Sequence, residues 1–64
     1  MNQIRAMREK RGMSQIKLGL LAGLPNSLIS DFELNKRVPW PKARRSIARA
    51  LKVKQAELFN EAGN

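Results

Sequence analysis

The sequence contains no cysteine and no histidine. Without cysteine, the chain can form neither disulfide bonds nor thiolate metal sites. Without histidine, it lacks the commonest metal ligand and the usual proton shuttle of enzymes. Its five acidic residues are scattered too widely along the sequence to suggest an acid–base pair. These absences argue against an enzyme, and neither a metal nor a cofactor is expected.

Long apolar segments are also missing from the sequence. No segment approaches the roughly 20 apolar residues that cross a bilayer, and none resembles the apolar core of a signal peptide. The sequence therefore predicts a cytoplasmic protein that makes no membrane contact. Its 64 residues, 42% of them hydrophobic, suffice for one small core, so a single domain over residues 1–64 is expected.

Positive charge is what the chain has in excess. Thirteen Lys and Arg residues against five acidic ones give a net charge of +8. Such a charge suits a nucleic acid, provided that the fold offers a shape able to enter a groove. Two alternatives are a basic surface that only contacts solvent and an anionic membrane as partner. The membrane alternative would need a long basic amphipathic helix, which the sequence does not offer.

Apolar residues at helical spacing fall into five short segments, which glycines, prolines and capping residues separate. No segment alternates with a period of two, so the sequence predicts an all-α fold. Asn2 and Ser14 are expected to cap the first two helices, and Pro25 and Pro41 to open the third and fourth. The expected helices cover about 3–11, 15–22, 26–34, 41–51 and 55–61. The expected core residues are Ile4, Met7, Met13, Leu18, Leu21, Leu24, Ile29, Phe32, Ala43, Ile47, Ala50, Leu51, Val53, Leu58 and Phe59.

Residues 15–34 have the pattern of a helix-turn-helix. Gly19 leaves room where the two helices would cross, and Gly23 can adopt the positive φ of the turn. Ile29 and Phe32 would face inward on the second helix of the motif, which is the helix that reads a DNA groove. An ordinary helical hairpin with a polar face is the alternative. The residues expected to point outward are Asn26, Ser27, Ser30, Asp31 and Leu34.

The sequence resembles the Cro/CI-type helix-turn-helix proteins, or XRE family, over nearly its whole length and without an insertion. The resemblance implies a compact five-helix, lambda-repressor-like domain that places the helix over 26–34 in the major groove. Gly19 departs from the alanine usual in the family, Pro25 from a serine or threonine cap, and Lys52 and Lys54 from glycine and serine. The matching positions are Arg8, Gly12, Ser14, Gln15, Leu18, Gly19, Gly23, Ile29, Ser30, Glu33, Pro39 and the segment 51–59.

Several residues are expected to hold the DNA backbone. The resemblance implies that Gln15 grips a phosphate and that the loop after residue 34 approaches the next phosphates. Independently, the helices over 15–22 and 41–51 begin without an acid in the first turn. Because a helix start favours anions, both starts suit docked phosphates. The expected phosphate contacts are Gln15, Lys17, Lys36, Arg37 and Lys42.

Base contacts are expected from the outward residues Asn26, Ser27 and Asp31. The Asn26 amide suits adenine, whereas Asp31 could accept from a cytosine amine or repel wrong sites. The resemblance also implies that Arg8 pairs with Glu33. Such a pair would hold the helix over 26–34 at its angle without adding much net stability.

These features predict a sequence-specific double-stranded DNA-binding protein, a transcriptional regulator of the repressor kind. It should bind a pseudo-palindromic operator as a homodimer, with half-sites roughly 34 Å apart. Val53, Leu58 and Phe59 could supply the dimer interface. One alternative is a protein-interaction module on the same fold, such as an antitoxin that binds a toxin. Another is the DNA-binding domain of a longer regulator.

Overall fold

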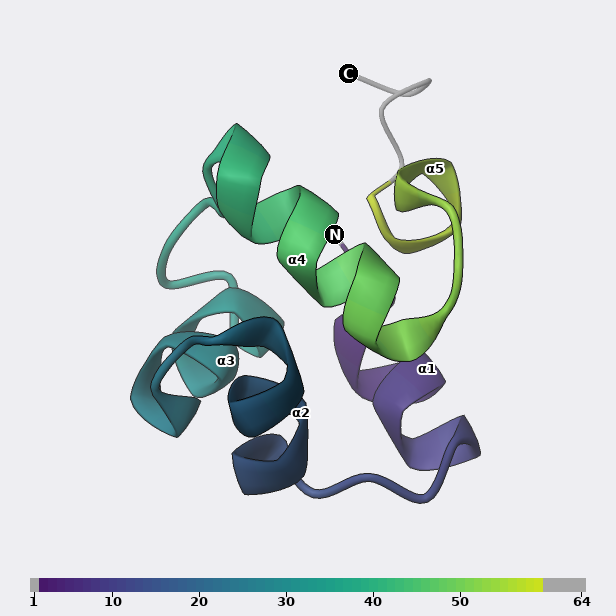
Figure 1. The fold of residues 1–64 in the computed structure, drawn as a ribbon. Helices are drawn as coiled ribbons and strands as arrows, with labels where there is room; N and C mark the ends of the chain where they lie inside the picture. Colours follow the sequence, from purple (N-terminus) through teal and green to yellow (C-terminus); the bar gives the residue numbers. More distant parts are fainter. Residues whose placement is uncertain (1, 60–64) are drawn as a thin grey trace.

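A computed structural model describes residues 2–59 and shows an all-α fold of five helices (Figure 1). The prediction of the fold class and of the five helices is therefore confirmed. Residues 60–61, the expected end of the last helix, lie outside the described residues. No helix in the described range is long and apolar enough to cross a membrane. The helices are α1 (Ile4–Lys10), α2 (Gln15–Ala22), α3 (Asn26–Glu33), α4 (Pro41–Leu51) and α5 (Gln55–Leu58).

The helices surround one core, with α2 packed against both α3 and α4. In Figure 1, α4 runs across the molecule above α2 and α3, while α1 and α5 lie at its other side. An isolated antiparallel bridge joins Asn2 to Phe59, and the Gln3 N–H donates to the Leu58 carbonyl at 2.7 Å. The end of α5 and Phe59 are thereby tied to the segment that precedes α1.

Most expected core residues are buried or packed against the core, but Leu21 is not. Its side chain is 52% exposed, so the prediction that Leu21 is buried was wrong. The reason is the close approach of the α2–α3 turn at Gly19, which turns the face carrying Leu18 and Gly19 inward. On α4, Ala48 is buried, whereas Ala50 only packs against the core edge. The buried hydrophobic residues are Ile4, Leu18, Ile29, Phe32, Ala43, Ile47, Ala48, Leu51, Leu58 and Phe59.

The ends of α1 to α4 differ little from those expected. The prediction that the last helix continues past Leu58 was wrong, because Phe59 is extended and forms the bridge to Asn2. The α1 helix is one residue shorter at each end, and Gln3 rather than Asn2 occupies the N-cap position. Asn2 nevertheless satisfies a helix-start donor, because its Oδ1 accepts from the Ile4 N–H at 3.1 Å. Ser14 caps α2 as predicted, with Oγ accepting from the Lys17 N–H at 3.0 Å. Asn35 follows α3 in the left-handed conformation, with φ 60°.

The crossing of α2 with the turn before α3 depends on Gly19. A Cβ atom built there would lie 2.5 Å from the Leu24 carbonyl oxygen and 3.4 Å from the Asn26 nitrogen. A contact of 2.5 Å with a backbone oxygen cannot form unless the backbone moves. The turn therefore lies closer to α2 than an alanine at position 19 would permit.

We expect Gly19→Ala to lower the free energy of unfolding by about 1 kcal/mol. Overpacking costs about 1–3 kcal/mol, and the helix propensity of alanine returns only about 1 kcal/mol of that. Chemical denaturation of the two proteins, followed by circular dichroism, measures the difference. An unchanged or higher stability of the variant would show that the turn moves away from α2 without cost.

Candidate nucleic-acid interface

The first turn of α3 presents polar side chains to solvent. Pro25 precedes the helix in an extended conformation and offers no side-chain cap. Asn26 and Ser27 follow it and are exposed, while Leu28 packs against the core edge. Ile29 and Phe32 are fully buried on the opposite side of the helix. This division leaves the start of α3 free to meet a ligand without disturbing the core.

Asp31, one turn further along α3, is only partly accessible. Its side chain is 36% exposed, and its Oδ2 lies 3.7 Å from Nε of Arg37. The Lys36 N–H donates to the Asp31 carbonyl at 2.8 Å. These two contacts fold the loop back along the end of α3, so that the exposed cations Lys36 and Arg37 stand beside it. The Asp31–Arg37 pair was not anticipated from the sequence.

The starts of α2 and α4 flank α3 (Figure 1). Neither helix carries an acidic residue in its first turn. Lys17 and Lys42 are exposed there, and α4 opens on Pro41 with no side-chain cap from Trp40. Each start thus offers backbone N–H groups, the positive end of a helix dipole and a cation, which together suit a phosphate.

Two ring contacts place α4 and the loop before it. The Trp40 ring packs edge-to-face on Phe32, with centroids 5.7 Å apart, so Trp40 covers the edge of the core. The Arg44 guanidinium lies 4.8 Å from the centre of the Phe59 ring. Arg44 is thereby directed toward Phe59, which follows α5, in a cation–π contact.

A buried ion pair joins α1 to the end of α3. Arg8 donates from Nε to Glu33 Oε2 at 2.7 Å and from Nη2 to Oε1 at 3.2 Å. Only 11% of the Arg8 side chain and 2% of the Glu33 side chain are exposed. The hydrogen bonds to Glu33 raise the pKa of Arg8 above its ordinary value, and burial opposes that shift. The guanidinium therefore stays charged, and the two-fold contact fixes the direction of α3.

Glu33 also receives Gln15, the first residue of α2. The Gln15 Nε2 donates to Glu33 Oε1 at 3.2 Å, and Arg8 Nη1 donates to the Met13 carbonyl at 2.7 Å. The primary amide has a second N–H, so Gln15 can still donate to a phosphate oxygen. The same carboxylate thus positions α1, the start of α2 and the end of α3.

Asn2 makes a further link that sequence reasoning missed. Its Nδ2 donates to the Phe32 carbonyl at 2.8 Å and to Asn35 Oδ1 at 3.3 Å. The segment before α1 is thus attached to the last turn of α3. Only its role as a helix cap could be read from the sequence, because the partner residues lie 30 and 33 positions away.

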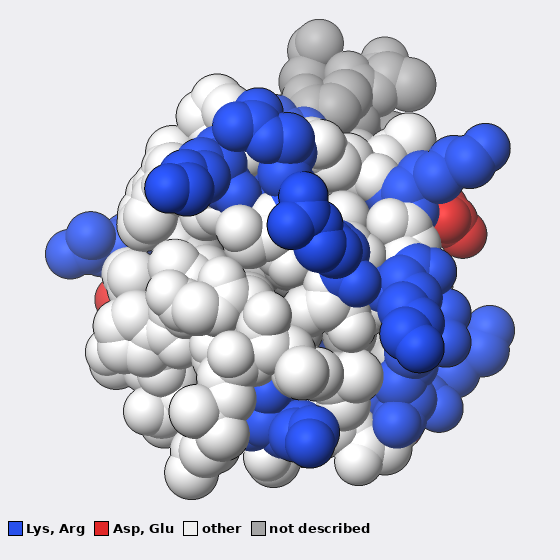
Figure 2. All heavy atoms as spheres, in the orientation of Figure 1, with Lys and Arg blue, Asp and Glu red and all other residues white. Residues whose placement is uncertain are grey.

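Charge is unevenly distributed over the surface. Figure 2 shows a broad area of mostly uncharged residues over α2 and the adjoining part of α3, with cationic side chains above it, to its right and at its lower edge. Ile16, Leu20 and Leu21 of α2 are among the exposed large hydrophobic residues. Val53, Leu58 and Phe59, expected at a dimer interface, are instead packed into or against the core.

The five helices and the exposed start of α3 define a DNA-binding domain of the helix-turn-helix class. A model of the helix-turn-helix family HTH_3 matches residues 4–58. The chain therefore belongs to the Cro/CI-type (XRE) helix-turn-helix family, whose members bind DNA and are not enzymes. A comparison with curated proteins gave no match.

We expect Glu33→Ala to cost about 3 kcal/mol of stability, because it leaves the Arg8 charge buried without its carboxylate. Arg8→Ala should be similarly harmful, while the double variant should lose less than the sum by about 1–3 kcal/mol. Denaturation of the three variants completes the double-mutant cycle. Glu33→Gln, which keeps the shape and an acceptor, should retain more stability than Glu33→Ala. Strictly additive losses would refute the coupling.

Proposed function

We propose that the chain is a transcriptional regulator that acts as a repressor, with residues 1–64 working as one DNA-binding domain. In this proposal α3 enters the major groove of a specific double-stranded site. The observation that carries it is the exposed start of α3, flanked by two helix starts that lack acids. Such a regulator acts where the DNA is, which in a bacterial cell is the cytoplasm.

The base contacts are assigned to the outward side of α3. Asn26 and Ser27 are exposed on that helix, and a bidentate amide matches the N6 and N7 edge of adenine. Asp31 stands further along, next to Arg37, where it can accept from a cytosine amine or repel a wrong base.

The phosphate contacts are assigned to residues around α3 on both sides. Gln15 and Lys17 lie at the start of α2, Lys42 lies at the start of α4, and Lys36 and Arg37 lie in the loop that Asp31 holds. All four cations are exposed, so they can reach a backbone without any rearrangement of the core. Their role is to position the protein on the duplex, since phosphates carry no sequence information.

We also propose that two copies bind a pseudo-palindromic site with half-sites about 34 Å apart. A single domain of this size binds DNA with only modest affinity. In a dimer, binding of one copy raises the effective concentration of the other at its half-site. Because Leu58 and Phe59 are buried, a dimer would need a surface other than the one expected from the sequence.

Selection of bound duplexes from a random pool tests the proposed function most directly. A symmetric pair of half-sites supports both specific recognition and two-fold binding. Binding that is weak and independent of sequence at low salt would contradict the regulator. A salt titration of duplex binding then separates the regulator from a protein-interaction module. For groove binding, the logarithm of the affinity should fall with the logarithm of the salt concentration, with a slope of about 0.9 per neutralised phosphate.

Asn26→Ala and Lys36→Gln should differ in a characteristic way. We expect Asn26→Ala to relax the preference at one base pair, at a cost of about 1–3 kcal/mol on the selected site. Lys36→Gln should weaken selected and random duplexes by the same factor and make the salt slope shallower by about 1. Fluorescence anisotropy on both duplexes measures these effects. Equal losses on both duplexes for Asn26→Ala would remove it from the base contacts.

Asp31→Asn should lower the ratio of selected to random affinity. The amide keeps the shape but removes a negative charge beside the groove, so random duplexes should bind more tightly and one base preference should weaken. The matched control is Glu9→Gln, which removes one exposed acid on α1 and should raise both affinities slightly without changing their ratio. If the ratio of selected to random affinity did not change in Asp31→Asn, the Asp31 side chain would have no part in base recognition and would serve only to hold Arg37.

A further inference from the structure

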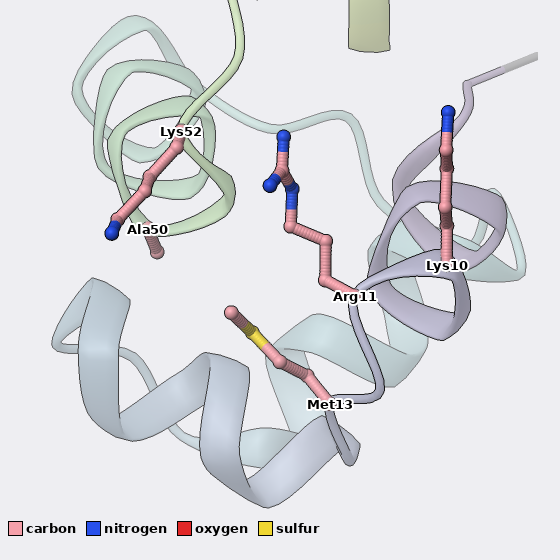
Figure 3. A pocket seen from close by; sticks show the side chains of 5 residues that line it. All are labelled: Lys10, Arg11, Met13, Ala50 and Lys52. Atoms are coloured by element: carbon pink, nitrogen blue, oxygen red, sulfur yellow. The ribbon is translucent and has the colours of Figure 1, made fainter.

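A hollow of about 340 Å³ lies between the ends of α1 and α4, and its charged lining residues are all cations. Lys10, Arg11 and Lys52 supply the charge, while Met13 and Ala50 complete the lining. Figure 3 shows the Arg11 guanidinium reaching into the space between the two helix ends, with Lys52 on the side of α4. The Lys10 amine points along the outside of α1. In Figure 1 these helix ends lie across the molecule from α3.

Attraction to the helix C-termini does not by itself account for the cation at residue 52. A lysine there does interact favourably with the end of the α4 dipole. Lys52, however, has φ 59°, a left-handed conformation that favours glycine or asparagine and is strained for a lysine. The strain of this conformation exceeds what an exposed charge gains at a helix end. A ligand that needs the amine would compensate for the difference.

The chemistry of the hollow favours a polyanion over a small anion. All three cations are exposed and remain hydrated, so a single phosphate would exchange one set of water contacts for another. A nucleic-acid backbone presents many charges at once and gains affinity from released counterions. We propose that this hollow contacts the phosphate backbone of a second DNA segment while α3 holds the first. The proposal rests on the proposed function, because it assumes that α3 is occupied by DNA.

One molecule with two such faces would bridge two segments of duplex. The described residues span 29 × 21 × 18 Å, so a duplex lying against α3 is separated from the hollow by the body of the domain. A regulator of this kind could hold a looped or neighbouring segment without sequence preference, since the lining offers charge and no base-reading amide.

The test immobilises the selected duplex, loads the protein, and then adds a random duplex with a different fluorescent label. Wild-type protein should retain the second duplex. Arg11→Gln/Lys52→Asn should retain about tenfold less of it and show a salt slope shallower by about 1.8, while the first duplex binds as before. Asparagine is chosen at 52 because it tolerates the left-handed conformation. Circular dichroism verifies that the variant is folded.

The control Arg45→Gln/Lys54→Gln also removes two positive charges, neither of them from a residue that lines the hollow. It should retain the second duplex. If both variants lost the second duplex equally, the effect would be one of net charge and not of the hollow. If Arg11→Gln/Lys52→Asn retained the second duplex as well as wild type does, the hollow would not be its binding site. A dimer of the protein would then hold the two duplexes. A wild-type protein that holds only the first duplex overturns the bridging proposal alone, whereas failure to hold the first duplex overturns the proposed function and the bridging proposal together.

Discussion

The orientation of α3 depends on the buried ion pair between Arg8 and Glu33. Burying both ions costs several kcal/mol of hydration, which the direct attraction only roughly offsets. The pair instead fixes the orientation of α3, because the guanidinium and the carboxylate meet in one plane through two hydrogen bonds. The remaining donor of Arg8 reaches Met13, and Glu33 also receives Gln15, so three segments share one polar centre.

Apolar packing holds α3 in the same orientation at its start and from beneath. At Gly19 the turn before α3 approaches the α2 backbone more closely than any side chain would permit. Phe32 then fills the core beneath α3 and carries the Trp40 ring at its edge. Since α3 is held by a charged pair at its end and by close packing at its start, its outward face keeps a fixed position. A fixed face is what groove recognition needs, because base contacts fail when they are displaced by about an ångström.

The fold could be predicted almost completely from the sequence, and the contacts between side chains only in part. Periodicity, glycines and caps report on neighbours within a few positions, so the boundaries of α1 to α4 were correct within one residue, whereas α5 ends at Leu58, three residues before its expected end. Leu21 was misplaced because helical spacing cannot show which side of α2 the turn approaches. The Asp31–Arg37 pair and the link from Asn2 to Phe32 join residues that no local pattern relates. The Arg8–Glu33 pair was anticipated only through the resemblance to a family.

The charge of the chain explains why several residues stand at positions that do not favour folding. Cations at the starts of α2 and α4 oppose the helix dipoles, and Lys52 occupies a conformation that suits glycine. The net charge of +8 adds mutual repulsion to a domain whose small core leaves little stability in reserve. A bound polyanion would reverse the first and the last of these terms, because phosphates suit helix starts and neutralise excess charge, whereas the backbone strain at Lys52 would remain. Binding to DNA and the stability of the fold are therefore thermodynamically linked, so a bound duplex stabilises the folded chain.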